Sequence, residues 1–246
     1  QRSPSHCAAL KPFHHLMSAL KFDALLFDCD GVLVDSEAIT HSVLCAMLNE
    51  AGWALSLHEC MGFFLGRTVR SQAALIEAHT GRPLTDAWMA EFYARRNTRL
   101  QLELQPIAGA LELVRWAHHS FQGRIACASG ADRQKVEMQL TLAGMAPYFA
   151  GQVFSGHELP RSKPAPDVYL AAAASLGGAP TRCLVLEDTE TGVTAGVAAG
   201  ATVLGFAPSG TTGHSAAQAL LAAGAVHVLQ HLNELPDWCL KNHQKT

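Results

Sequence analysis

The strongest indication of the fold lies in Ala24-Leu25-Leu26-Phe27-Asp28-Cys29-Asp30-Gly31-Val32-Leu33-Val34-Asp35-Ser36. Its first four residues form an apolar run that is typical of a buried strand. Asp28 and Asp30 follow one residue apart and point to the same side, and Gly31 lets the chain turn tightly after them. Carboxylates crowded in this way repel each other unless a cation or a proton lies with them. The stretch therefore indicates metal-assisted chemistry at the end of a strand.

The same stretch has two other interpretations. Asp and Gly are ordinary turn residues, and an Asp-x-Asp-Gly sequence also begins many calcium-binding loops. A calcium loop needs a further oxygen ligand at its fifth position and a Glu at its twelfth. Val32 and Ile39 occupy those positions, so the calcium-loop interpretation is excluded.

The composition indicates a globular enzyme and gives no reason to expect a polyanionic partner. The 246 residues are 49% hydrophobic and 16% charged, which is enough apolar material for one large domain or a core with a smaller domain. The net charge of -3 offers no electrostatic basis for binding nucleic acid or an anionic membrane. No apolar stretch approaches the roughly 20 residues of a membrane span. We therefore expect a cytoplasmic protein without nucleic-acid or membrane partners.

The seven cysteines are scattered and contain no Cys-x-x-Cys pair. Cys127 and Cys183 lie in apolar, strand-like runs, so we expect reduced core thiols rather than disulfides. The thirteen histidines form no His-Glu-x-x-His motif or Cys/His cluster, and we expect them to be structural or solvated. Residues 1–16 lack a signal-peptide apolar core and are expected to form a disordered leader.

The first strand, expected at residues 22–27, is followed by a long section with helical spacing and little strand signal. Helices are predicted at about residues 39–52, 68–79 and 85–100. Because this block lacks strand–helix alternation, residues 34–103 are predicted to be an all-helical insert, or cap.

From Ile107 onward, strands alternate with helices. Strands are predicted at 124–128, 152–154, 183–186 and 202–206, with 226–228 as a further edge strand, and helices at 109–120, 132–143, 166–176 and 192–199. Near-continuous apolar strands of this kind indicate a parallel sheet covered on both faces. The predicted fold class is therefore α/β, a doubly wound parallel sheet formed by residues 17–33 and 104–240.

Polar residues follow several of these strands, and the carboxyl ends of strands are where open α/β sheets bind ligands. Ser129-Gly130, Lys163 and Glu187-Asp188 all fall at or near such ends, as do Asp28 and Asp30. Each alone has an ordinary explanation: a loop, a surface charge, or acidic residues favouring a helix N-terminus. Together they provide a nucleophile, an acid/base, a hydroxyl donor, a cation and metal-binding carboxylates at one rim.

This ordered set resembles the haloacid dehalogenase (HAD) superfamily, specifically its phosphatase and phosphomutase branch with a small helical cap. The resemblance covers about residues 22–210 and rests on DCDGVLVDSE (28–37), SKPAPD (162–167) and LEDTETG (186–192). These motifs are similar to those of β-phosphoglucomutase-like enzymes and sugar-phosphate phosphatases. Residues 153–156 and 161–164 are also similar to 6-phosphogluconate phosphatases.

The resemblance implies a phosphatase that works through an aspartyl phosphate. Asp28 would attack phosphorus, and Asp30 would protonate the leaving alkoxide and later activate water. Ser129 and the amide of Gly130 would donate hydrogen bonds to the phosphoryl oxygens. Lys163 would neutralise charge on the nucleophile and the phosphoryl group.

The resemblance also implies a Mg²⁺ cofactor. The ion would be held by the Asp28 carboxylate, the Asp30 backbone carbonyl and Asp188, with Glu187 as a ligand or as a partner of the ligands. Hard oxygen ligands of this kind suit Mg²⁺ rather than zinc.

In the cap, the expected specificity segment is Phe64–Arg70, in which Gly66, Arg67 and Arg70 would contact the substrate. In the β-phosphoglucomutase pattern a basic residue falls where Val69 stands, and a histidine where Thr40 stands. His41 is one place away, which is expected to put it on a different face of the helix. These departures favour a hydrolase acting on a phosphorylated sugar or sugar acid, with a phosphomutase as the alternative.

Three rivals fit less well. A 2-haloacid dehalogenase needs neither Asp30 nor the metal cluster, and Asp30 also argues against a phosphonate hydrolase. A phospho-receiver domain carries its acceptor on a later strand and lacks a helical cap. The expected partner is a small phosphorylated substrate, and a monomer is the default oligomeric state.

Overall fold

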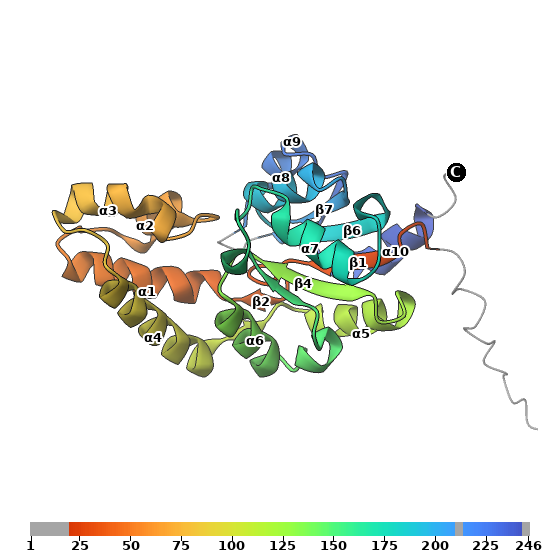
Figure 1. The fold of residues 1–246 in the computed structure, drawn as a ribbon, viewed down its shortest axis with the longest axis horizontal. Helices are drawn as coiled ribbons and strands as arrows, with labels where there is room; N and C mark the ends of the chain where they lie inside the picture. The colour runs from red at the N-terminus through yellow and green to blue at the C-terminus, as the bar shows by residue number, and fades with distance from the viewer. Residues whose placement is uncertain (1–19, 210–213, 243–246) are drawn as a thin grey trace, which may run out of the picture.

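The computed structural model describes residues 20–209 and 214–242, and its central feature is a six-stranded sheet (Figure 1). The strands are β1 (Ala24–Phe27), β4 (Ile125–Ser129), β5 (Val153–Ser155), β6 (Cys183–Glu187), β7 (Thr202–Phe206) and β8 (His227–Leu229). All are parallel, in the order β5-β4-β1-β6-β7-β8. The chain adds β4 and β5 on one side of β1 and then β6, β7 and β8 on the other side, so the strand order reverses beside β1. The predicted α/β class with a doubly wound parallel sheet is confirmed.

Alternation along the strands divides the core into two layers. Leu25 and Phe27 of β1 face one apolar cluster, while Ala24 and Leu26 face the other. The first cluster contains side chains of α5 (Ala110–Ser120), α6 (Arg133–Leu142) and α10 (Glu234–Lys241). The second contains side chains of α7 (Asp167–Ser175), α8 (Glu190–Ala198) and α9 (Ala217–Ala222). Helices therefore cover both faces of the sheet, and its apolar strands are buried on both sides.

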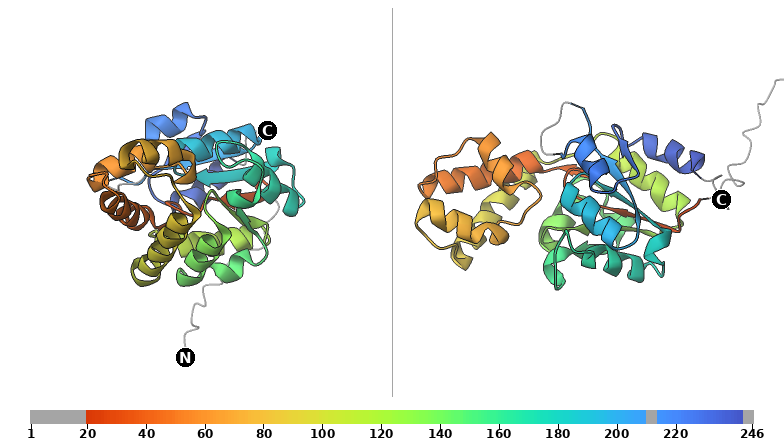
Figure 2. Two further views of the ribbon diagram at one scale, coloured as in Figure 1. Left: turned by 60° about the vertical axis from the view of Figure 1, so that its left-hand side comes forward. Right: turned by 90° about the horizontal axis from the view of Figure 1, so that it is seen from above.

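Four helices lie between β2 (Val34–Asp35) and β3 (Gln105–Pro106), and we refer to residues 37–103 as the helical insert. They are α1 (Glu37–Glu50), α2 (Leu57–Phe64), α3 (Ala73–Thr80) and α4 (Asp86–Glu103). The insert has its own apolar cluster, formed around Leu44, Leu48, Phe64 and Phe92. It lies beyond one end of the sheet (Figures 1 and 2).

The strands β2 and β3 pair with each other rather than with the main sheet. Their antiparallel register is Val34 opposite Pro106 and Asp35 opposite Gln105. The chain therefore leaves for the insert and returns from it at one place.

Most predicted elements agree with the structure within a few residues. The β2–β3 pair and helices α2, α9 and α10 were not predicted. The helix expected at 68–79 begins instead as a short 3-10 turn (Arg70–Gln72) that leads into α3. The expected leader, residues 1–16, lies outside the described residues.

The cysteines of the described region are free and buried, as expected for Cys127 and Cys183. Among residues 20–209 and 214–242, we find no helix that is both long and apolar enough to cross a membrane.

Candidate active site

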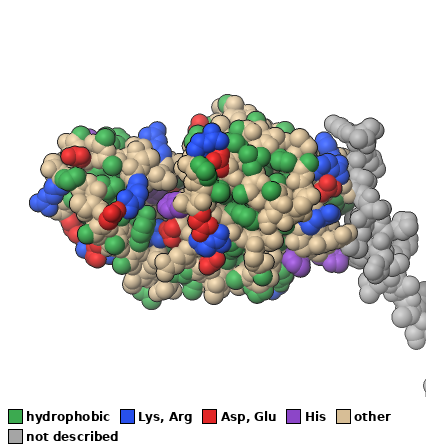
Figure 3. All heavy atoms as spheres, in the orientation of Figure 1, with side chains coloured by type: hydrophobic (Ala, Val, Ile, Leu, Met, Phe, Trp, Pro, Cys, Tyr) green, Lys and Arg blue, Asp and Glu red, His purple; other side chains and the backbone are tan. Residues whose placement is uncertain are grey.

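The predicted site residues meet at the carboxyl edge of the sheet, where the insert faces it. Asp28 follows β1 directly, Ser129 ends β4, and Glu187 ends β6. With Lys163 from the loop before α7, they line a cavity of about 730 Å³. Gly130, Gly66, Arg67 and Arg70 line the same cavity. In Figure 3, acidic, basic and histidine side chains gather at the junction between the insert and the sheet.

Lys163 joins two of the carboxylates. Its Nζ lies 2.6 Å from Asp28 Oδ1 and 2.6 Å from Glu187 Oε1. Burial disfavours a charged ammonium, but Asp28 and Glu187 outweigh it and hold the pKa of Lys163 well above its usual value. The lysine is therefore a fixed positive charge beside Asp28.

Asp28 is buried among like charges. Burial, together with Glu187 and Asp30 and against the opposing effect of Lys163, raises its pKa to about 7. The fold thus holds this carboxylate where its charged form costs free energy, and that cost falls when another cation approaches.

A group of three acidic side chains provides a place for such a cation. Oxygens of Asp28, Glu187 and Asp188 lie within 4.8 Å of one another. Both side-chain oxygens of Asp188 are buried, and neither has a hydrogen-bond partner among the described residues. Burial and the neighbouring carboxylates raise the pKa of Asp188 well above its usual value. Unpartnered carboxylate oxygens in this setting fit a hard divalent cation.

Glu187 differs from its neighbour because its oxygens already accept hydrogen bonds. Oε1 accepts from Lys163 and from the Tyr169 hydroxyl at 2.9 Å. Oε2 accepts from the backbone N–H of Asp188 and from both the backbone N–H and the hydroxyl of Thr189. This arrangement fixes Glu187 as an anchor for Lys163 and leaves Asp188 as the more open oxygen donor.

Two glycines make room for these carboxylates. A Cβ atom on Gly31, whose φ is +80°, would lie 2.1 Å from Asp188 Oδ2. A Cβ atom on Gly192 in α8 would lie 1.7 Å from Glu187 Oε1. Both distances are far below van der Waals contact, so any larger residue would displace a site carboxylate.

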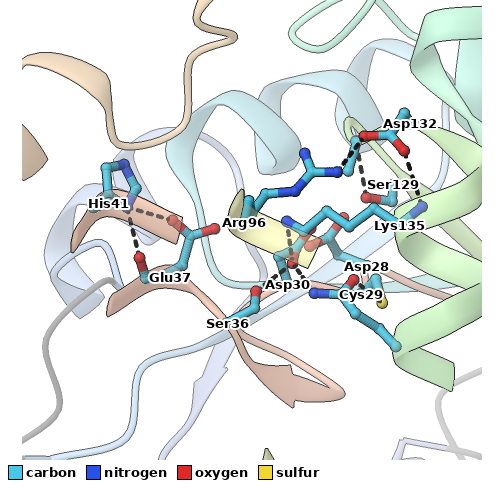
Figure 4. A network of polar contacts seen from close by, with 12 residues as sticks. Asp28, Cys29, Asp30, Ser36, Glu37, His41, Arg96, Ser129, Asp132 and Lys135 are labelled. Carbon is cyan, nitrogen blue, oxygen red and sulfur yellow. Dashed lines mark hydrogen bonds and ion pairs between the residues drawn. The ribbon is translucent and has the colours of Figure 1, made fainter. Parts of the chain in front are cut away.

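Asp30 is held apart from this acidic group. Its Oδ1 accepts hydrogen bonds from Lys135 Nζ at 2.7 Å, from Gln139 Nε2 at 2.9 Å, and from the Ser36 hydroxyl (Figure 4). Burial opposes ionisation, but these donors prevail and lower the pKa of Asp30 to about 2. In this arrangement Asp30 is ionised at neutral pH and can accept a proton.

Sequence reasoning missed Lys135 and Gln139. The available signal was a lysine and a glutamine four residues apart on a predicted helix, beside the apolar Val136 and Leu140. Polar side chains on a buried helix face need hydrogen-bond partners, but the sequence pattern does not identify Asp30 as that partner.

The insert contributes one ion pair across the junction. Arg96 of α4 donates from Nη2 to Asp132 Oδ2 at 3.0 Å, and Asp132 is the residue just before α6 (Figure 4). The predicted residues of the insert, Gly66 and Arg70, make weaker or more exposed contacts. Arg70 is 54% exposed and bonds to Asp86 at 2.8 Å, while the Gly66 carbonyl accepts from Thr191 at 3.3 Å.

Thr40 and His41 are adjacent in α1, and both line the cavity although successive helical positions point in different directions. The His41 ring bonds to the Glu37 carbonyl at 2.8 Å and lies 3.1 Å from its carboxylate. The cavity is wide enough to contact adjacent positions of the helix.

Comparison with known proteins agrees with this geometry. The family model for haloacid dehalogenase-like hydrolases matches residues 22–200. The chain belongs to this family. The resemblance inferred from the three sequence motifs is thereby confirmed.

Two curated relatives from Escherichia coli are phosphatases by name. The 6-phosphogluconate phosphatase is 28% identical over 76% of this chain and 83% of its own. The fructose-1-phosphate phosphatase is 28% identical over 73% of this chain and 94% of its own. Among solved structures, a HAD family hydrolase from Deinococcus radiodurans with bound phosphate and sodium is 33% identical. It covers 90% of this chain and 96% of its own, with a TM-score of 0.72. The chain is thus a hydrolase whose similar proteins include sugar-phosphate phosphatases.

Proposed function

We propose that this protein is a Mg²⁺-dependent phosphatase that hydrolyses a small phosphorylated sugar or sugar acid through an aspartyl phosphate. The observation that carries the proposal is the buried group formed by Asp28, Lys163, Glu187 and Asp188. It combines a carboxylate nucleophile, a fixed cation and an unpartnered metal-binding oxygen pair at one point.

Asp28 is the nucleophile in this proposal. Its carboxylate oxygen forms a bond to phosphorus as the bond from phosphorus to the leaving oxygen breaks. Asp30, which is ionised before substrate binds, first takes up a proton as the substrate enters and then gives that proton to the leaving oxygen. Water then attacks phosphorus and gives a proton to Asp30, and the bond between Asp28 and phosphorus breaks to release phosphate. Splitting one displacement into two lowers each barrier.

Asp28, Asp188 and the Asp30 backbone carbonyl would hold Mg²⁺. When bound, the ion would neutralise charge on the nucleophile and on the phosphoryl oxygens. Asp188 suits this role because its oxygens lack partners among the described residues, while Glu187 holds Lys163 in place.

Ser129, Gly130 and Lys163 would receive the phosphoryl oxygens. The Ser129 hydroxyl oxygen accepts the Ala131 N–H at 3.0 Å, which leaves the hydroxyl hydrogen free to donate elsewhere. Donors fixed before reaction stabilise developing negative charge without reorganising.

In this proposal the chain divides into a core of residues 17–33 and 104–240 and a cap of residues 34–103. The cap would exclude water and contact the leaving group. Its separate apolar cluster and its position over the cavity support this division. The two named phosphatase relatives support a sugar-derived leaving group.

The test is hydrolysis of a panel of sugar phosphates and sugar-acid phosphates with and without Mg²⁺. Asp28→Asn should abolish turnover while leaving the thermal transition cooperative. The matched control is Asp35→Asn, because Asp35 belongs to the same stretch but is exposed. Appreciable phosphatase activity in Asp28→Asn would refute the nucleophile assignment. Conversion between hexose monophosphates only when a hexose bisphosphate is added would indicate a phosphomutase instead.

A further inference from the structure

Arg96 is a buried guanidinium that lines the cavity from the insert. Its side chain is only 5% exposed, and the rings of Phe92 and Tyr93 lie 5.8 Å and 4.7 Å from its guanidinium carbon. Nε and Nη2 donate to the Asn97 side chain, and Nη2 also donates to Asp132. A guanidinium in such a place needs an anion close to it.

Arg96 has a hydrogen-bond donor group that no described residue uses. Within the described part of the chain, its Nη1 group donates to no acceptor, although guanidinium carries five N–H donors in all. Asp132 is also shared, because its other oxygen accepts the Lys135 backbone N–H at 2.9 Å and caps α6. Arg96 therefore keeps a donor available for a second anionic partner.

Further basic side chains line the same cavity. Arg67, Arg70 and Lys135 line it with Arg96, and so does the imidazole of His157. Burial lowers the pKa of His157; Asp132 opposes this effect, while Arg96, Arg70 and Lys135 add to it. Lys135 is occupied by Asp30 and Arg70 by Asp86, so Arg96 is the buried cation best placed for a ligand.

We propose that Arg96 binds a second anionic group, a carboxylate, on the leaving part of the substrate. This inference rests on the proposed phosphatase function and narrows it from sugar phosphates in general to phosphomonoesters of hydroxy acids and sugar acids. Guanidinium suits this role because its planar N–H donors match a carboxylate.

Asp132 explains how such a site avoids an unpaired buried charge. Arg96 is paired with Asp132 whenever no substrate carboxylate is present. A carboxylated substrate adds to this pair or takes the place of Asp132, so the guanidinium stays neutralised throughout. A neutral leaving group offers Arg96 nothing that Asp132 does not already provide, and it gains no binding free energy here.

The experiment compares kcat/KM for two matched pairs of substrates. The pairs are 6-phosphogluconate against glucitol 6-phosphate, and 3-phosphoglycerate against glycerol 3-phosphate. Within each pair the members differ chiefly in the carboxylate. We expect the carboxylated member to be preferred by about tenfold to a hundredfold in at least one pair, the range of a charged hydrogen bond.

Variants of Arg96 and Asp132 test whether Arg96 binds the substrate or only holds the insert against the core. Arg96→Gln should reduce the preference to near one, and Arg96→Lys should keep part of it. Asp132→Asn retains a helix-capping oxygen and removes the competing charge, so it should keep or increase the preference. The ratio within a pair is the readout, because impaired folding or closure lowers both values together.

Three results would overturn the proposal. The first is equal kcat/KM within both pairs for the unmodified protein, which would leave the phosphatase assignment intact. The second is that Arg96→Gln and Asp132→Asn each lower kcat/KM by the same factor for both substrates of a pair. The ion pair would then have only a structural role. The third is the absence of phosphatase activity on every substrate, including p-nitrophenyl phosphate, which would overturn the proposed function as well.

Discussion

Asp28 is a buried carboxylate, and the groups nearest to it form a connected chain of ion pairs and hydrogen bonds. Lys163 pairs with it, Glu187 fixes Lys163, and Tyr169 and Thr189 fix Glu187. Each bond restricts the next group, so the proposed nucleophile is positioned before any substrate arrives. Such preorganisation is what phosphoryl transfer chiefly requires of a protein.

The two proposed duties of Asp30 can be separated by choosing the leaving group. p-Nitrophenolate leaves without a proton, whereas a sugar alkoxide needs one. Asp30→Asn should therefore release a burst of up to one equivalent of nitrophenolate per enzyme and then turn over about 10²- to 10⁴-fold more slowly. With a sugar phosphate, the same variant should release no burst of the sugar, because the alkoxide cannot leave without a proton. Rapid-mixing absorbance measures the burst, and equal behaviour of both substrates would contradict the two assigned roles.

Gly192 offers a test of how closely the site is packed. Gly192→Ala places a Cβ atom 1.7 Å from the present position of Glu187 Oε1, so Glu187 must move and its bond to Lys163 must break. We expect a loss of about 2–3 kcal/mol in the free energy of unfolding, together with loss of activity.

Gly62→Ala is the matched control for Gly192→Ala. A Cβ atom at Gly62, in helix α2, meets nothing within 4 Å. This variant should be neutral or gain about 0.4–1 kcal/mol, with activity unchanged. Chemical denaturation measures both variants, and similar effects on stability would show that the packing around Glu187 is looser than the structure indicates.

The residues that were predictable share one property: their position relative to a strand end defines them. Asp28, Ser129 and Asp188 could be placed because parallel strands bring their carboxyl ends together. Lys135 and Arg96 could not, because they come from different helices whose separation depends on tertiary packing. No local pattern shows which carboxylate a helical cation will reach.

Among the helices and strands, those with a long apolar or periodic sequence pattern could be predicted. β1, β4, β6 and β7 are apolar runs of four or five residues, and the sequence signals them clearly. β2 and β3 contain two residues each, with Asp35, Gln105 and Pro106 exposed, so no periodicity exists to detect. Their pairing depends on the insert bringing residues 34 and 106 together.

Helix caps provide a prediction at this scale. Ser56 caps α2 and Thr189 caps α8, each by accepting a backbone N–H. Ser56→Ala and Thr189→Ala should each cost about 1 kcal/mol, or about 2–4 °C in Tm. Only Thr189 also bonds to Glu187, at 3.0 Å, so only Thr189→Ala should reduce kcat or weaken Mg²⁺ activation. Thermal melts and Mg²⁺ titrations of activity measure both effects, and equal activity of the two variants would separate Thr189 from the site.

For the molecule as a whole, the buried acidic group formed by Asp28, Glu187 and Asp188 lowers the stability of the folded state, and a bound cation would relieve this cost. Burial raises the pKa of Asp28 from 3.8 to about 7 in the folded chain. The folded state therefore binds this proton more tightly than the unfolded state, and its contribution to stability is lost as the pH rises from about 4 to 7. Mg²⁺ in the proposed site would compete with protons for the same oxygens, so it would stabilise the folded protein most where they are ionised.

We therefore expect saturating Mg²⁺ to raise Tm by about 5 °C or more at pH 8 and by clearly less at pH 5. Asp188→Asn should raise the Tm of the metal-free protein and remove most of the Mg²⁺ effect, because it deletes a buried charge that lacks a hydrogen-bond partner among the described residues. Differential scanning fluorimetry at both pH values measures these shifts. The same Mg²⁺ shift at pH 5 and pH 8 would argue against ion binding at these carboxylates.

The pairing of β2 with β3 has a consequence for how proteins of this kind diversify. Because the chain leaves and re-enters the core through two strands bonded to each other, the covalent connections of the intervening segment to the core lie at one place. Its interior packs around its own apolar cluster, so substitutions there need not propagate into the sheet. Recombination at residues 35 and 105 would exchange the insert, with its proposed leaving-group contacts, and retain Asp28, Lys163, Glu187 and Asp188 in the core. Substrate range and reaction chemistry can thus evolve as separate traits on one chain.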